Sequence, residues 1–370
     1  MTAPVAVRMC NPGSRSCVTR AAWLIPAAMI VIALEARAQV RADTETGALP
    51  RIVSHDPRFD RLVPPDVRIE TIATGFHWVE GPVWIPPPAL DPAREHDGAL
   101  LFSDIPANAV IEWREQHGTR VFLQPSGYSG AAPFEGREPG SNGLALDAAG
   151  RLVLCEHGNR RITRLERDGT RTVLADRFDG RRLNSPNDAA FAPDGSLWFT
   201  DPPFGLPLAF DDPRKELPFS GVYRLSTDGT LALMTTALRA PNGIAFSPDG
   251  RTLYVSNADR DHARVFAFDV RADGSLGQAR EFFDASPWVA RWPGAPDGMK
   301  TDAQGNVFLA GPGGVHVIAP DGTHLGSILL GGATSNVAWG GAGGSQLYIT
   351  AGTSVYRVIT TTRSPSARRS

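Results

Sequence analysis

The sequence contains little that would cross-link or anchor the folded chain. Only three of its 370 residues are cysteine, and Cys10 and Cys17 both lie near the N-terminus. Removal of an N-terminal leader would leave Cys155 alone, so we expect no internal disulfide and no cysteine–histidine zinc site. The longest apolar run, 21–34, has 14 residues, whereas a helix that spans a bilayer needs about 20.

An excess of charge and a helical periodicity are also missing. The chain has 37 Lys and Arg residues against 39 Asp and Glu residues, and no basic block is long enough to predict nucleic-acid binding. No long window shows the 3.6-residue period of an amphipathic helix. Glycine (38) and proline (31) are abundant and scattered, which favours many short strands joined by tight turns.

The N-terminus has the pattern of an export signal. Three arginines precede the apolar run, and Ala36–Ala38 supplies an A-x-A cleavage motif. We therefore predict a signal peptide at residues 1–38 and a periplasmic or secreted protein without a stable membrane anchor. An uncleaved anchor is the alternative interpretation of the same run. Residues 39–65 are rich in Pro, Asp and Arg and are predicted to form a linker.

One pattern recurs six times along the rest of the chain. A short polar motif containing Asn or Asp precedes a first strand, a tight turn often built on Asp-Gly follows, and further strands lead to the next motif. Units of about 40–55 residues match the blades of a β-propeller. The predicted fold is an all-β, six-bladed β-propeller over residues 66–360, with a disordered tail at 361–370. A β-sandwich, the alternative, accommodates six such copies poorly.

The ends of the repeat predict how the propeller closes. The last unit stops after its third strand at Val358, while Ile69–Ala73 stands alone before the first unit. We expect this N-terminal strand to be the outer strand of the last blade, because the pairing removes an open sheet edge. Strand alternation then places the polar motifs and the long loops 126–140 and 204–220 on one face, the motif face. The Asp-Gly turns lie on the opposite turn face.

Six equivalent positions at the starts of the first strands carry side-chain oxygens. These motif positions are Glu80, Asn142, Asn187, Asn242, Asp297 and Asn336. In a six-bladed ring they point at the central channel, so carboxylates and amide carbonyls would converge there without lysine or arginine among them. Such a set suits a hard cation, calcium first, rather than zinc or copper. The alternative is that Asn merely turns the chain before each strand.

Several motifs in combination resemble the gluconolactonase, regucalcin (senescence marker protein) and luciferin-regenerating enzyme superfamily. They are Glu80–Trp84, Leu101–Pro106, Asn184–Asp188, Phe199–Pro202, Pro241–Gly243 and Pro296–Met299. The segment Glu156–Arg161 resembles the bacterial gluconolactonase branch in particular. The resemblance extends over most of the chain, from Ile69 to Val358.

This resemblance implies a six-bladed propeller with one divalent cation at its axis. The implied ligands are Glu80, Asn187, Asn242 and Asp297, and Asp297 is also the implied acid/base residue. Calcium is the expected ion, with magnesium, manganese and zinc as alternatives. Ser185 stands where regucalcin has its sugar-binding arginine, which leaves the preference for sugar lactones open.

Other polar residues on the motif face are candidates for a substrate pocket. They are Asn142, His157, Ser185, Asp188, Asp201 and Asn336. His157 or Asp188 is an alternative to Asp297 as the proton carrier, although His157 equally suits a hydrogen-bonded loop and Asp201 a loop cap. The predicted function is divalent-metal-dependent hydrolysis of a sugar lactone or related small lactone. A phosphotriesterase-like or other ester hydrolase and a non-catalytic calcium-binding propeller are the alternatives.

Overall fold

Short strands alternate with tight turns throughout the described residues, which are 48–87 and 98–366 of the computed structural model. Helix is limited there to the four-residue α2 (Pro57–Asp60) and α3 (Ser286–Val289) and to the 3-10 turns η1 (Ala209–Asp211) and η2 (Arg260–His262). The all-β prediction is therefore confirmed. The predicted signal peptide lies outside the described residues.

Four sheets each contain four antiparallel strands in sequence order. The first sheet contains β3 (Val79–Ile85), β4 (Ala99–Asp104), β5 (Ala109–Arg114) and β6 (Gly118–Leu123). The second sheet contains β7 (Ser141–Leu146), β8 (Leu152–Glu156), β9 (Arg161–Leu165) and β10 (Arg171–Ala175). The third sheet contains β13 (Ala189–Phe191), β14 (Leu197–Asp201), β15 (Gly221–Leu225) and β16 (Leu231–Thr235). The fourth sheet contains β17 (Pro241–Phe246), β18 (Thr252–Asn257), β19 (Arg264–Asp269) and β20 (Arg280–Asp284). A hairpin of β11 (Arg177–Phe178) and β12 (Arg181–Arg182) precedes β13.

The remaining strands form one seven-stranded sheet instead of two separate blades. They are β1 (Arg51–Ser54), β2 (Ile69–Thr74), β21 (Met299–Thr301), β22 (Val307–Ile318), β23 (His324–Gly340), β24 (Gln346–Ala351) and β25 (Ser354–Ile359). The first part of β23 pairs with β22, with Leu329 opposite Gly314, and its last part pairs with β24, with Trp339 opposite Leu347. Because one uninterrupted strand serves both pairings, the described residues contain four separate four-stranded sheets rather than the six that the repeat predicts.

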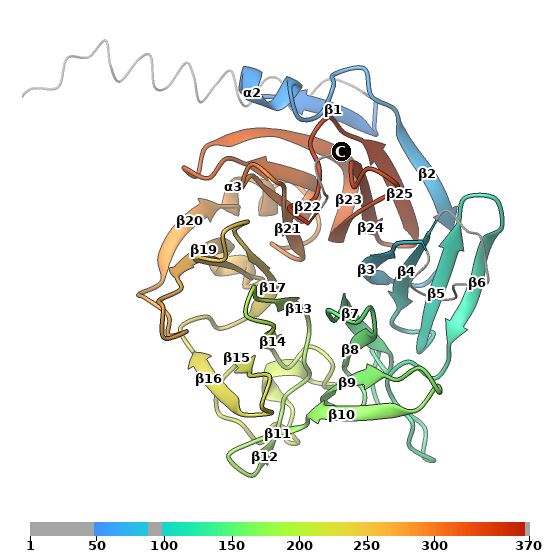
Figure 1. Cartoon of the computed structure of the whole chain (residues 1–370), viewed down its shortest axis with the longest axis vertical. Coiled ribbons are helices and arrows are strands. Elements are labelled where there is room, and N and C mark those ends of the chain that lie inside the picture. Colours follow the sequence, from blue (N-terminus) through green and yellow to red (C-terminus); the bar gives the residue numbers. More distant parts are fainter. Residues whose placement is uncertain (1–47, 88–97, 367–370) are drawn as a thin grey trace, which may run out of the picture. The chain divides into compact units, whose positions relative to one another are not determined.

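The sheets follow one another around a common centre (Figure 1), and strands β3, β7, β13 and β17 lie closest to that centre. The strand expected to accompany the last repeat, β2, lies beside β25, with Ile69 opposite Val358 and Thr74 opposite Ser354. This arrangement is that of a β-propeller.

Apolar side chains fill the space between neighbouring sheets. Trp198 of β14 packs with Ile244 of β17 and Leu253 of β18, and these three side chains are fully or almost fully buried. Cys155 of β8 packs in a comparable cluster with Phe199 of β14. The thiol is fully buried, as predicted from its mid-strand position. Burial of such side chains between sheets is the main contribution that holds the ring of sheets together.

Part of the segment predicted to be a linker is folded. Strand β1 pairs with the first half of β23, with Arg51 opposite Leu329. The ring of Phe59 in α2 is fully buried, and Leu62 and Val63 are buried beside it. The linker prediction is therefore wrong for residues 51–63, because their many polar residues conceal three apolar side chains that pack in one core cluster.

The predicted disordered tail is wrong for residues 361–366, which pack on the turn face. Thr361 N donates to Leu62 O at 3.0 Å, and Ala303 N donates to Arg363 O at 2.8 Å. The buried Thr362 hydroxyl donates to Asp302 Oδ2 at 2.8 Å. Hydrogen bonds, rather than burial of apolar side chains, order these polar residues. Their composition therefore gave no sign of order and led to the prediction of a disordered tail. Residues 367–370 lie outside the described residues.

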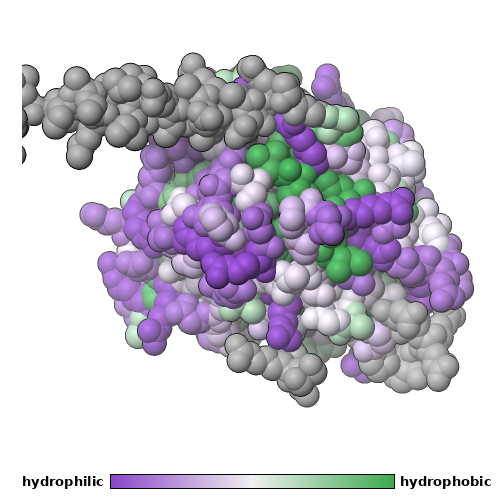
Figure 2. All heavy atoms as spheres, turned by 90° about the horizontal axis from the view of Figure 1, so that it is seen from above, coloured by the Kyte–Doolittle hydropathy of each residue, from purple (hydrophilic) through white to green (hydrophobic). Residues whose placement is uncertain are grey.

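Hydrophilic residues cover most of the side of the molecule seen in Figure 2, and hydrophobic residues gather in a smaller area of it. Within residues 48–87 and 98–366, the large hydrophobic side chains that are clearly exposed are Leu49, Val121, Val173, Leu208 and Ile359. Single apolar side chains at the surface are ordinary in folded proteins. Among the described residues, no helix has the length and hydrophobicity required to cross a membrane.

Candidate metal site and active site

The motif positions are packed against one another through glycines that follow them. A Cβ built on Gly81 would lie 2.1 Å from Asn142 O, and one built on Gly243 would lie 2.2 Å from Asp297 O. Both distances are too short for a real side chain, so only glycine allows the backbones to approach this closely. Gly143 N also donates to Asn187 O at 2.7 Å.

Hydroxyl groups on neighbouring strands bond the motif carbonyls and continue these links. Ser103 Oγ donates to Asn142 O at 2.8 Å, Thr200 Oγ1 to Asn242 O at 2.6 Å and Ser256 Oγ to Asp297 O at 2.8 Å. Gly298 N donates to Ser335 O at 2.8 Å, and Ser335 Oγ donates to Val79 O at 2.7 Å. The contacts therefore run from Glu80 through Asn142, Asn187, Asn242, Asp297 and Asn336 and return to the first strand.

Four of the six motif positions hold a buried oxygen without a hydrogen-bond partner. These atoms are the Oδ1 atoms of Asn142, Asn187, Asn242 and Asp297. A buried polar atom that is left unpaired costs about 1–3 kcal/mol, and native proteins rarely leave such atoms without a reason. Oxygen donors that lack hydrogen-bond donors are what a hard cation requires, so these residues fit the predicted ion.

The side chains at the six motif positions together form what we call the motif ring. Its two carboxylates, those of Glu80 and Asp297, are held in surroundings that disfavour negative charge. Glu80 is buried, and burial together with the charge of Asp188 raises its pKa to about 8. Burial and the charges of Glu80 and Asp188 raise the pKa of Asp297 well above its usual value. Carboxylates that raise one another's pKa lie close together. A bound cation would stabilise their charged forms.

Asn336 differs from the other asparagines because its side chain is fully engaged. Its Nδ2 donates to Glu80 Oε2 at 3.2 Å and to Asp188 Oδ2 at 3.4 Å, while its Oδ1 accepts from Val337 N at 2.9 Å. Asp188 is buried, its Oδ1 accepts from Ala189 N at 2.9 Å, and its Oδ2 lies 3.9 Å from Lys300 Nζ. Asn336 therefore links the Glu80 and Asp188 carboxyl groups through hydrogen bonds.

His157 forms a pair with Glu138, a residue that sequence reasoning missed. The imidazole is fully buried, its Nδ1 lies 2.8 Å from Glu138 Oε2, and its Nε2 has no partner. The charge of Glu138 contributes to the raised pKa values of Glu80 and Asp297, which places the pair beside the motif ring. Glu138 belongs to the long loop 126–140, and only the length of that loop pointed to a function.

Ser185 and Asp201 are buried and bonded to the backbone of the surrounding loops. Asp201 accepts from Asn184 N and Ser185 N, both at 2.8 Å, and burial raises its pKa to about 7. The Ser185 hydroxyl donates to Pro202 O at 2.6 Å and accepts from Gly205 N at 2.9 Å. Both side chains are fully buried, so a substrate contact would require breaking these bonds.

In residues 48–87 and 98–366, no three or more carboxylate, imidazole or thiol side chains group into a metal site by themselves. A cation in the motif ring therefore needs the asparagine oxygens as donors. This requirement matches the residue types at the motif positions, four of which are asparagine.

A channel with a volume of about 460 Å³ runs along the inner strands from the motif positions toward the turn face. Residues of all six inner strands line it just after their motif positions, mostly with apolar side chains such as those of Val83, Leu144 and Ile244. Ser364–Ser366 of the C-terminal segment also line it. The polar ring therefore lies at one end of a largely apolar channel, and the C-terminal segment lies at the other.

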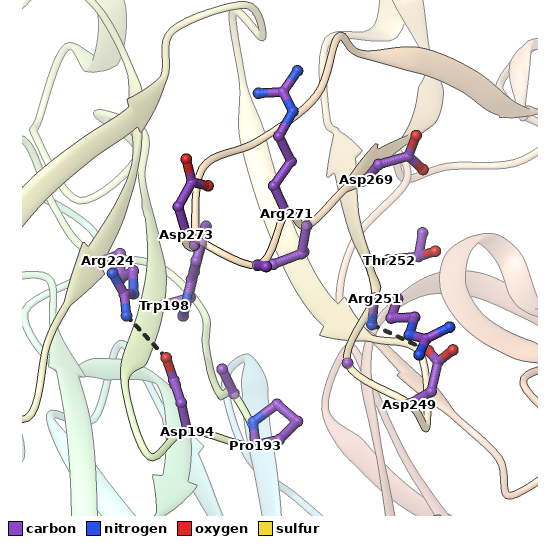
Figure 3. A pocket seen from close by; sticks show the side chains of 15 residues that line it. Pro193, Asp194, Trp198, Arg224, Asp249, Arg251, Thr252, Asp269, Arg271 and Asp273 are labelled. Carbon is purple, nitrogen blue, oxygen red and sulfur yellow. Dashed lines mark hydrogen bonds and ion pairs between the residues drawn. The ribbon is translucent and has the colours of Figure 1, made fainter.

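A second cavity, of about 600 Å³, lies between turns at the strand ends opposite to the motif positions. Its charged lining residues alternate in sign (Figure 3), and Arg224 Nη2 lies 2.9 Å from Asp194 Oδ2 across one side of it. Asp249 and Asp273 belong to the neighbouring turns. None of the predicted site residues lines this cavity.

The fold and the ring define a β-propeller with oxygen-bearing side chains gathered at one end of its channel. Residues 78–353 match the family described as the SMP-30/Gluconolactonase/LRE-like region, and the chain belongs to this family. The family resemblance predicted from the sequence motifs is therefore confirmed.

Known relatives and solved structures agree with this assignment. A gluconolactonase from Zymomonas mobilis is 37% identical over 362 residues, covering 94% of this chain and 97% of the relative. The structure of a gluconolactonase from Xanthomonas campestris is 34% identical, with a TM-score of 0.70 and coverage of 85% and 97%. A calcium-binding regucalcin from Agrobacterium tumefaciens shares the fold at 21% identity, with a TM-score of 0.60 and coverage of 80% and 95%.

Proposed function

We propose that this protein is a metal-dependent hydrolase that opens the ring of a sugar lactone or a related small lactone. Membership of the family and the near full-length similarity to a gluconolactonase support this reaction class. The observation that carries the proposal is the set of unpaired, buried oxygens at Asn142, Asn187, Asn242 and Asp297. Without a ligand, these four atoms would be desolvated without compensation.

We assign the cation to Glu80, Asn187, Asn242 and Asp297, the set that the family resemblance implies. Three of them present an unpaired Oδ1, and the fourth is a buried carboxyl beside Asp188. Calcium suits a set of oxygen donors, and magnesium, manganese and zinc are the alternatives. When bound, the ion supplies Lewis-acid polarisation of the lactone carbonyl.

The residues of the ring would position the lactone and move one proton. Water adds to the carbonyl carbon, the bond from that carbon to the ring oxygen breaks, and the proton lost by water ends on the ring oxygen to give a hydroxy acid. Asp297 is our choice for the carrier, because the family resemblance implies this role and positioned carboxyl groups act as general acids and bases.

A second candidate carrier is the pair of His157 and Glu138. In the tautomer that donates from Nδ1 to Glu138, the unpaired Nε2 of His157 is free to accept a proton. Asp188 suits this role less well, since its two oxygens already face Ala189 N, Asn336 Nδ2 and Lys300 Nζ. Asn142 is the remaining pocket candidate with an unpaired oxygen, and we assign it to substrate contact.

We also infer that the propeller has six blades, of which the seven-stranded sheet supplies two joined through β23. The unbroken series of contacts from Glu80 to Asn336 and back supports this count, as does the channel lined by six inner strands. The pairing of β2 with β25 supports closure of the last blade by the N-terminal strand.

We further propose that the protein is exported to a periplasm or secreted. Support comes from the arginines, the short apolar run and Ala36–Ala38 in the sequence. N-terminal sequencing of the mature protein should find a start near Gln39, and an intact Met1 in exported material would contradict the proposed cleavage.

The direct test of function is a substrate screen of metal-free protein titrated with calcium, magnesium, manganese and zinc. We expect hydrolysis of small lactones that depends on the added ion. Faster turnover of a phosphotriester or an open-chain ester would favour the alternative hydrolases. Calcium binding without turnover of any substrate class would identify a non-catalytic binding propeller.

A further inference from the structure

Lysine is almost absent from this chain. Of the 37 basic residues only Lys215 and Lys300 are lysine, and the other 35 are arginine. Lys215 lies in the loop before β15, where its Nζ donates to Leu217 O. Lys300 lies in β21 and lines the central channel. In a chain that otherwise uses arginine, the lysine at this place puts a compact ammonium charge into the channel.

The ammonium group of Lys300 reaches the motif ring from the channel side. Its Nζ lies 3.9 Å from Asp188 Oδ2 and donates to Asn336 Oδ1 at 3.5 Å and to Met299 O at 3.1 Å. The Asn336 amide in turn donates to Glu80 Oε2 at 3.2 Å and to Asp188 Oδ2 at 3.4 Å. One connected network therefore links Lys300 to a residue assigned to the cation.

Counting charges shows what this ammonium group contributes. Four carboxylates lie at or beside the ring, those of Glu80, Asp188, Asp297 and Glu138, and each carries −1 when ionised. The +1 of Lys300 offsets one of these negative charges, so the ring attracts a cation less strongly than it would without the lysine, and the difference grows with the charge of the cation. The channel below is lined mainly by apolar side chains, and charges interact more strongly in such surroundings than in water.

We propose that Lys300 is a positioning residue that sets the net charge of the motif ring and thereby favours divalent over trivalent cations. It acts through Asp188 and Asn336, since its ammonium group lies beside the Asp188 carboxylate and offsets one negative charge next to the bound ion. The inference rests on the proposed function and deepens it, because it concerns which ion the same site selects.

Calorimetric titration of metal-free protein with calcium and with lanthanum tests the proposal. Lys300→Met keeps the length and apolar stem of the side chain and removes its charge. Repulsion by Lys300 is proportional to the charge of the ion, so if calcium affinity rises about tenfold, lanthanum affinity should rise about thirtyfold. The ratio of lanthanum to calcium affinity should therefore increase about threefold.

Two variants are matched controls. Lys215→Met makes the same substitution at the other lysine and should leave both affinities unchanged. Lys300→Arg retains the charge and should keep the affinity ratio of the wild type. If Lys300→Met does not fold, Lys300→Gln removes the charge while keeping a donor for Asn336, and the same threefold change in ratio is expected.

Several results would overturn the proposal. Equal fold-changes for the two ions, or unchanged affinities in a folded charge-free variant, would show that Lys300 is only a structural hydrogen-bond donor. In that case wild-type protein still binds calcium and the proposed function stands. Failure of the wild type to bind either ion would overturn the cation site itself, and this inference with it.

Discussion

Replacing Gly243 by alanine tests whether close backbone packing holds the motif ring together. The added Cβ would lie 2.2 Å from Asp297 O, 2.7 Å from Gly298 Cα and 2.9 Å from Asp297 C. All three are backbone atoms, so relief requires a shift of the inner strands rather than rotation of a side chain. Overpacking of this kind costs about 1–3 kcal/mol. The shift would also separate Asn242 from Asp297, two residues assigned to the cation.

Urea unfolding and calcium calorimetry measure the two consequences of Gly243→Ala. We expect the free energy of unfolding to fall by about 1–3 kcal/mol and calcium affinity to fall at least about tenfold. Gly332→Ala is the matched control, since a Cβ there meets no atom within 4 Å, and its stability should change by less than about 0.5 kcal/mol. Wild-type stability and affinity in Gly243→Ala would refute the packing argument.

Three further predictions concern the cation, the closure of the ring and the response to acid. Glu80→Gln should lower calcium affinity in calorimetry and reduce activity mainly through that loss, so activity should largely return at saturating calcium. Deletion of residues 69–73 should abolish soluble, cooperatively unfolding protein, because it exposes the edge of β25; a truncated protein that melts like the parent would disprove this pairing. Burial lowers the pKa of His316 to about 4, so the unfolded chain takes up this proton before the folded chain does as the pH falls below about 6.5. Urea unfolding should therefore show a loss of stability between about pH 6.5 and 4. One pH unit below 6.5, the free energy of unfolding should have fallen by about 1.4 kcal/mol. His316→Gln should weaken this pH dependence.

The repeat was readable in the sequence because each unit repeats its local chemistry. Gly195 and Gly250 adopt positive φ angles of 83° and 70° in their Asp-Gly turns, a conformation that favours glycine. Asn142, Asn187 and Asn242 are each followed, after one intervening residue, by a short run of apolar residues. These signals lie within a few residues of one another, so turns, strands and motif positions could be located without a structure.

Contacts between distant segments leave no such periodic signal. Nothing in the repeat indicates that β23 continues through two pairings, or that Phe59 packs on Gly326 more than 250 residues later. The pairing of His157 with Glu138 joins a strand end to an irregular loop. Ser185 and Asp201 were predicted as pocket candidates from their residue types, which do not show that both side chains are buried and hydrogen-bonded to loop backbone.

The measurement that tests the central claim most directly is lactone hydrolysis by Asp297→Asn at saturating calcium. The substitution keeps the number of side-chain oxygen and nitrogen atoms at the ring but removes one charge and the proton-carrying carboxyl. Calcium binding should survive in weakened form, as calorimetry would show, while turnover of a good lactone substrate should fall at least about a hundredfold. Turnover equal to that of the wild type would contradict a catalytic ring and leave the cation with a structural role.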